Sequence, residues 1–233
     1  MSTKDDTGTD RDADASADTD TDSMNDAETT DDGTGTDGET YRREPARRAF
    51  AAELNDATHV FRESDEERAP KYALLPTGEK ANRVLHIGTL LDVDRVGSGE
   101  TIKARIVDSS GDPETGNGAA TLYVYAGQYE PEAASALEAL EPPAYVAVVG
   151  KPDTFENDEG EPLATIRPES IAEVDADERD TWVLAAAERT LDRLDRRERG
   201  ENEYAEMAAD IYGADADRYA EGVRLALTSL ADG

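Results

Sequence analysis

Two short segments carry the side chains best suited to contact a ligand. Lys103 and Arg105 alternate with apolar residues in 101–107, and Tyr123 and Tyr125 alternate with apolar residues in 120–126. Successive side chains of a β-strand point to opposite faces, so the two cations and the two rings leave the core together if the strands are neighbours. Such a surface suits a single strand of nucleic acid, because every base offers a π-face on which a ring can stack.

The same four residues also have a purely structural explanation. Tyrosine is common on exposed strand faces, and cross-strand pairs of tyrosine and arginine stabilise sheets. The pattern of residue types leaves both interpretations open.

Further ligand-binding candidates lie at the ends of predicted strands. Arg83 opens the first strand, and Lys151 and Phe155 fall in the predicted loop between the last two strands. An aromatic side chain in a hairpin loop favours a contact with a ligand. A plug against the end of the barrel is an equal alternative for Phe155.

The sequence contains no recognisable catalytic chemistry. With 55 acidic residues, neighbouring carboxylates occur by chance and do not identify an acid–base pair. Cysteine is absent, and His59 and His86 are the only histidines, with no metal-ligand motif between them. We therefore expect a protein that is not an enzyme and that binds no metal or cofactor.

The elements that would position these residues follow one recognisable order. Strands are predicted at 83–93, 101–107 and 120–126, then a helix at 131–140, then strands at 144–150 and 163–167. A helix between the third and fourth of five strands is the layout of the OB barrel. The predicted fold is mainly β with a helical C-terminus: a five-stranded OB barrel at 83–175, an N-terminal extension and C-terminal α-helices.

The flanking regions differ from the barrel in composition. Residues 1–40 contain 14 acidic residues and almost no large apolar ones, which predicts a disordered acidic tail. A helix is predicted at 41–56 from the stripe of Ala46, Phe50 and Leu54, followed by an extended segment to residue 82. We expect the whole of 41–82 to pack on the barrel.

Residues 176–233 show helical periodicity. Helices are predicted at about 177–199, at about 204–213 and at about 219–230. The first presents a stripe with Trp182, Leu191 and Leu194, which we expect to bind a partner subunit. Packing of the three helices into a small unit of the same chain is the alternative.

The charge of the chain indicates its environment. The formal net charge is −31, and the only lysines are Lys4, Lys71, Lys80, Lys103 and Lys151. High salt shortens the Debye length to about 3 Å at 1 M, which makes such self-repulsion tolerable and favours a halophilic origin. An acidic protein that binds basic partners is the alternative. No apolar run is long enough for a membrane span and the N-terminus has no apolar signal core, so a cytoplasmic location is expected.

Several runs of the chain resemble the haloarchaeal replication protein A family, and more narrowly its shorter associated proteins. The similar runs are 51–57, 63–72, 123–131, 142–152, 166–171 and 179–193, within a resemblance that covers about 41–230. The resemblance implies an OB fold and a non-catalytic subunit of a hetero-oligomeric complex that binds single-stranded DNA in replication and repair. The larger replication protein A subunit would be the partner, and the zinc motif of some larger relatives is missing. The alternative is an assembly partner that never touches DNA.

Overall fold

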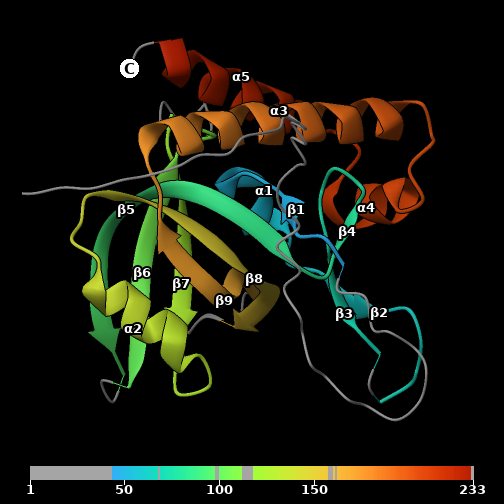
Figure 1. Ribbon diagram of the computed structural model, residues 1–233. Helices are drawn as coiled ribbons and strands as arrows, with labels where there is room; N and C mark the ends of the chain where they lie inside the picture. The colour runs from blue at the N-terminus through green and yellow to red at the C-terminus, as the bar shows by residue number, and fades with distance from the viewer. Residues whose placement is uncertain are drawn as a thin grey trace, which may run out of the picture. The chain divides into compact units, whose positions relative to one another are not determined.

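A closed β-barrel forms the centre of the computed structural model, which describes residues 44–67, 69–97, 100–111, 118–156, 160 and 162–231 (Figure 1). Its strands are β5 (Val84–Val96), β6 (Thr101–Asp108), β7 (Ala120–Ala126), β8 (Ala144–Glu156) and β9 (Pro162–Glu173). They follow one another in the order β5-β6-β7-β9-β8, and β8 pairs back to β5. β7 and β9 are parallel, and the other pairs are antiparallel. With α2 (Pro131–Ala139) between β7 and β8, this is the topology of the OB barrel, which confirms the predicted fold class.

Strand alternation determines the barrel core. Ile102, Ala104 and Ile106 of β6 point inward and are buried, and Leu122 and Val124 of β7 join them. Burying each large apolar side chain contributes roughly 1.5–3 kcal/mol to folding, so this alternation fixes which side of each strand faces outward.

Two short helices pack into the same core at opposite ends of the barrel. α1 (Ala51–Asp56) contributes Leu54 and lies where β6 ends, and α2 contributes Leu137 and follows the end of β7. Because β6 and β7 are antiparallel, those two strand ends lie at opposite ends of the barrel.

The helix predicted at 41–56 is shorter than expected, because α1 begins only at Ala51. Residues 44–50 are extended, and β1 (Arg47–Arg48) pairs with the start of β5. The barrel itself supplies the start of the helix: the Asp108 carboxylate accepts from the Ala51 N–H at 2.8 Å, and the Ser110 hydroxyl accepts from the Ala52 N–H at 3.2 Å. The predicted disordered tail at 1–40 and the predicted helix start at 41–43 lie outside the described residues.

The segment at 57–82, predicted as an extended loop, contains a small antiparallel sheet. Its strands are β2 (Val60–Arg62), β3 (Lys71–Leu74) and β4 (Lys80–Ala81). Tyr212 from a C-terminal helix holds this sheet, because its hydroxyl donates to the Leu74 carbonyl and accepts from the His59 N–H, each at 2.9 Å.

The C-terminal helices pack on their own barrel. They are α3 (Ala176–Glu198), α4 (Ala205–Tyr212) and α5 (Asp217–Ala231), and α3 and α5 run side by side (Figure 1). α3 starts at a capping box formed by Asp175 and Glu178. A second apolar core between α3, α5 and the outer side of β5 contains Phe50, Ile87, Trp182, Val183, Ala186, Ala187, Val223 and Ala226. None of the helices in the described ranges is long and apolar enough to cross a membrane.

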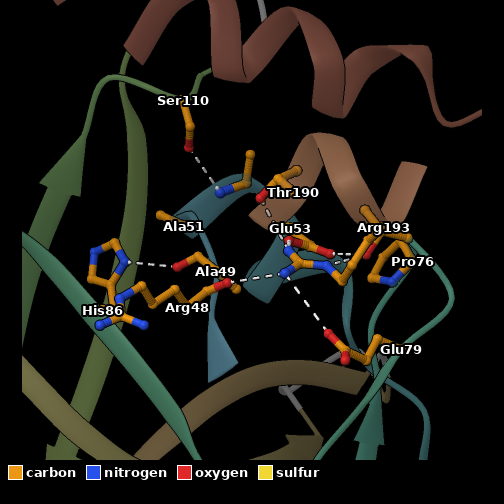
Figure 2. Close-up of polar contacts among 12 residues, drawn as sticks. Arg48, Ala49, Ala51, Glu53, Pro76, Glu79, His86, Ser110, Thr190 and Arg193 are labelled. Carbon is orange, nitrogen blue, oxygen red and sulfur yellow. Dashed lines mark hydrogen bonds and ion pairs between the residues drawn. The ribbon is translucent and has the colours of Figure 1, made fainter. Parts of the chain in front are cut away.

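A buried ion pair joins α3 to the N-terminal extension. The Arg193 guanidinium lies 2.6 Å from the Glu53 carboxylate and donates to the Arg48 carbonyl at 3.2 Å (Figure 2). It also donates to the Thr77 hydroxyl at 2.8 Å. The two charged side chains are only 3% and 1% exposed. This polar cluster therefore links the segment that precedes the barrel in the chain to α3, which follows it.

Candidate nucleic-acid interface

The outward side of β6 and β7 carries the four residues singled out by the alternation. Lys103 lies opposite Tyr125 in the register, and Arg105 lies opposite Tyr123. We call the surface formed by Lys103, Arg105, Tyr123 and Tyr125 the β6–β7 face. The structure brings these residues together, as the alternation of the two strands predicted.

Lys103 and Tyr123, which are diagonal neighbours on this face, already contact each other. The Lys103 ammonium lies 4.2 Å from the centre of the Tyr123 ring, a cation–π contact. Tyr123 is nevertheless 38% exposed, so part of its ring surface is open to solvent. It offers a platform for a planar ligand.

Phe155 extends the aromatic part of the β6–β7 face. β8 runs further than predicted, so Phe155 lies in a strand opposite Leu163 rather than in a loop. Its ring meets that of Tyr125 edge-on, with centroids 5.6 Å apart and planes at 76°. Phe155 is 39% exposed and does not plug the end of the barrel. The exposed Leu163 beside it was not among the predicted site residues.

Two aspartates on β5 lie next to the cations of the face, and one of them bonds Arg105. Arg105 donates from Nε to Asp92 at 2.6 Å, and this hydrogen bond, with the charge of the carboxylate, raises the pKa of the guanidinium above its usual value. Asp94 lies opposite Lys103 in the register. Sequence reasoning passed over both aspartates as chance acids, although their alternation on a strand beside β6 was a usable signal.

Arg83 and Lys151 belong to a second set of residues. They line a hollow of about 610 Å³ with Arg167 and the exposed Tyr129, and its lining includes none of the four residues of the β6–β7 face. Arg167 donates to Glu130 at 2.8 Å, and Arg83 donates to Glu169 at 2.6 Å. Three carboxylates, those of Glu130, Glu132 and Glu169, balance its three cations. The predicted DNA-binding residues therefore form two groups, of which the β6–β7 face is the aromatic one.

The predicted partner stripe on α3 is divided between the interior and the surface. Trp182 is 4% exposed and packs edge-on against Phe50 and His86, each at 5.4 Å, so it does not face a partner. Leu194 is half-buried, whereas Leu191 is 44% exposed. Leu184, one heptad before Leu191, is 56% exposed and was not predicted. The helical spacing of the apolar residues was predicted correctly, but the buried side of α3 packs against the barrel of the same chain.

The two histidines do not form a metal centre with other ligands. His86 is fully buried with Nδ1 3.3 Å from the Ala49 carbonyl, and burial lowers its pKa despite the nearby Asp108 carboxylate. His59 stacks near Phe61, with ring centroids 6.0 Å apart. Across the described ranges, no group of three or more His, Cys, Asp or Glu side chains could hold a metal ion.

Neither a known family model nor a curated protein matches this chain. Among solved structures, an OBody bound to hen egg-white lysozyme is similar over 57% of this chain and 98% of its own, at 14% identity and a TM-score of 0.35. A small single-stranded DNA-binding protein from Mycoplasma pneumoniae is similar over 39% of this chain and 90% of its own, at 15% identity and a TM-score of 0.30. The mitochondrial single-stranded DNA-binding protein Rim1 from S. cerevisiae is similar over 40% of this chain and 94% of its own, at 17% identity and a TM-score of 0.30. The OB topology is assigned from the strand order and closure of the barrel, not from these likenesses.

Proposed function

We propose that this protein binds single-stranded DNA as a non-catalytic subunit of a replication protein A complex that acts in DNA replication and repair in the cytoplasm. The observation that carries the proposal is the convergence of Tyr123, Tyr125 and Phe155 on one exposed barrel surface. Alanine substitution of such rings costs roughly 1–3 kcal/mol per stacked base in single-strand binders.

The charge of the chain supports a contact through bases more than through phosphates. Each phosphate contact weakens with salt at a log–log slope of about −0.7 on single strands, whereas stacking depends little on salt. Arg105 is already bonded to Asp92, and the whole chain carries −31. Binding through aromatic rings suits a face whose Arg105 is already bonded to Asp92, and it suits the high salt concentration expected inside a halophilic cell.

The subunit role rests on the family resemblance and on an exposed apolar surface. Leu184 and Leu191 lie on one side of α3, and both are open to solvent. We propose that they contact the larger replication protein A subunit, in place of Trp182, and that Leu194 supports them from its half-buried position. The complex is then a hetero-oligomer.

A second candidate function is assembly without DNA contact. It is favoured by the same exposed leucines and by Asp92, which already bonds Arg105 of the β6–β7 face. Coverage of that face by 57–82 would have supported it further, but Tyr123 remains 38% exposed.

Fluorescence anisotropy with a labelled oligo-dT tests the proposal, using the full chain in molar salt, alone and with the larger subunit. The variant Tyr123→Ala with Tyr125→Ala should lose most binding, while Tyr129→Ala, a more exposed tyrosine outside the face, should not. No binding by either wild-type form would leave only the assembly function. Binding that survives the double change would move the site to the hollow of Arg83 and Lys151.

A further inference from the structure

A hollow of about 310 Å³ lies between β1 and the C-terminal half of α3. Arginine dominates its lining: Arg47 comes from β1, and Arg189, Arg193 and Arg196 come from α3. Glu79 and Asp192 are the acidic residues that line it. We call it the arginine hollow.

Helix geometry explains why three of these side chains gather. Residues 189, 193 and 196 are spaced by four and three positions, which places them on one side of a helix. Arg193 forms the floor of the hollow, held by Glu53 and the Arg48 carbonyl (Figure 2) and by the Thr77 hydroxyl. Neighbours in a strand point to opposite sides, so the hollow takes the side chain of Arg47 and only the backbone of Arg48.

The other three guanidinium groups have unused donors. Among the described residues, the Arg47, Arg189 and Arg196 side chains make no hydrogen bond; the nearest carboxylate oxygens are Glu79, 3.5 Å from Arg47, and Asp192, 3.8 Å from Arg196. Charge-assisted hydrogen bonds are usually about 2.7–2.9 Å long, so these contacts are loose ion pairs that a better acceptor can replace. By contrast, Arg83 and Arg105 bond their carboxylates at 2.6 Å.

The arginines line the hollow from two sides, β1 and α3, and this arrangement indicates which kind of anion it can hold. A carboxylate has two oxygens in one plane and satisfies one guanidinium fork, whereas the tetrahedral oxygens of a phosphate can accept from several directions. Three guanidinium groups remain after Glu53 neutralises Arg193, against two carboxylates in the lining. In a chain of net charge −31, this is a local excess of positive charge.

We propose that Arg47, Arg189 and Arg196 form a phosphate-binding site above the Arg193 floor. The site is separate from the β6–β7 face and goes beyond the function proposed for that face. Its ligand is a phosphate group, carried either by a free polyphosphate compound or by the backbone of a nucleic acid strand.

Calorimetric titration of the full chain with tripolyphosphate tests the site, at a salt concentration where circular dichroism shows the native fold. The wild type should bind, and Arg189→Gln with Arg196→Gln should weaken binding by about tenfold or more, because the ligand loses several charge-assisted hydrogen bonds. Glutamine is a good helix former, so α3 should be kept. Arg47→Gln, in the opposite wall, should also weaken binding.

The matched control is Arg199→Gln with Arg224→Gln, which changes the net charge equally at exposed positions outside the arginine hollow. Its affinity should equal that of the wild type. Equal losses in both double variants, or no binding by the wild type, would overturn the proposal. Displacement of tripolyphosphate by polyglutamate at the same charge concentration would overturn it in favour of an acidic peptide.

Two labelled oligo-dT lengths distinguish the sources of the phosphate. Single OB barrels cover about 4–16 nucleotides, so strands of about 8 and about 30 nucleotides test the barrel alone and the barrel with its surroundings. If the site holds a strand, Arg189→Gln with Arg196→Gln weakens only the longer one. If it holds a free polyphosphate, neither changes while tripolyphosphate binding is lost. Failure of all oligonucleotide binding would refute the function proposed for the β6–β7 face and leave the tripolyphosphate result intact.

Discussion

Arg105 and Asp92 are joined across β6 and β5 by a hydrogen bond of 2.6 Å on the β6–β7 face. The cation most obviously suited to a phosphate therefore has an acceptor of its own. A nucleic acid strand must either compete with Asp92 or bind the face through its bases.

Replacing Asp92 by Asn should release Arg105 for phosphate. Oligonucleotide affinity should rise most at the lowest salt at which the protein stays folded, and the log–log salt slope should become steeper by about 0.7, the value for one added phosphate contact. Anisotropy titrations over a salt series measure both quantities. Asp210→Asn removes the same charge at an exposed position of α4. An equal change in affinity and salt slope in that variant would show that only the overall charge repulsion between protein and DNA had been lowered.

The rings of the face should matter more than its cations. At about 2 M salt, phosphate contacts are largely screened while stacking persists. Tyr123→Ala with Tyr125→Ala should then weaken oligonucleotide binding more than Lys103→Ala with Arg105→Ala. The Lys103 ammonium packs on the Tyr123 ring, so a small loss from the cation pair is still expected. The reverse order of effects would show that charge dominates the site.

The Glu53–Arg193 pair should be essential for stability. Glu53→Gln leaves a guanidinium 3% exposed without its counter-charge, and breaking a buried pair in this way costs about 3–5 kcal/mol. Glu79→Gln, whose carboxylate lies 3.9 Å from the same guanidinium and is more exposed, should cost under about 1 kcal/mol. Urea unfolding in molar salt compares the two variants, and similar losses would contradict the central role of the buried pair.

The partner surface proposed on α3 can be tested separately from the buried side of the helix. Leu184→Ser with Leu191→Ser should release the larger replication protein A subunit in a pull-down and barely change the free energy of unfolding, because both side chains are largely exposed. Trp182→Ser should instead destabilise the chain itself by about 3–5 kcal/mol, as for other buried aromatic truncations. Retention of the partner by the leucine variant would place the interface elsewhere.

Local patterns predicted the parts of the fold that depend on one element at a time. The period of two in 101–107 identified Ile102 and Ile106 as core and Lys103 and Arg105 as surface, and the order of strands and helix identified the OB barrel. These inferences succeed because a strand with one buried side must alternate.

The features that the sequence did not reveal depend on contacts between distant segments. α1 starts at Ala51 because Asp108 caps it from 57 residues away, and the stripe of Phe50 and Leu54 is split between two cores. The side of α3 that holds Trp182 is apolar whether its own barrel or a partner subunit covers it. The spacing of apolar residues along the helix therefore could not show which of the two packs against it. Arg105 was predicted at the correct position, but the compensation by Asp92 depends on a strand register that includes a bulge.

The stability of the protein should fall with acid because of His86. Burial lowers the pKa of this imidazole, opposed by the Asp108 carboxylate and the Ala49 carbonyl, while an unfolded histidine titrates near about 6.5. As the pH falls below that value, His86 is protonated in the unfolded chain but stays neutral in the folded chain. The free energy of unfolding therefore decreases by at most about 1.4 kcal/mol for each pH unit of acidification. Burial raises the pKa of Asp56, which acts in the opposite direction toward the more acidic range where aspartate titrates, so the measurements should stay close to neutral pH. Urea titrations of the wild type and of His86→Gln between about pH 7.5 and 5.5 should show a slope only in the wild type. Equal slopes in both proteins would assign the pH dependence to other groups, whatever the stability lost by the substitution itself.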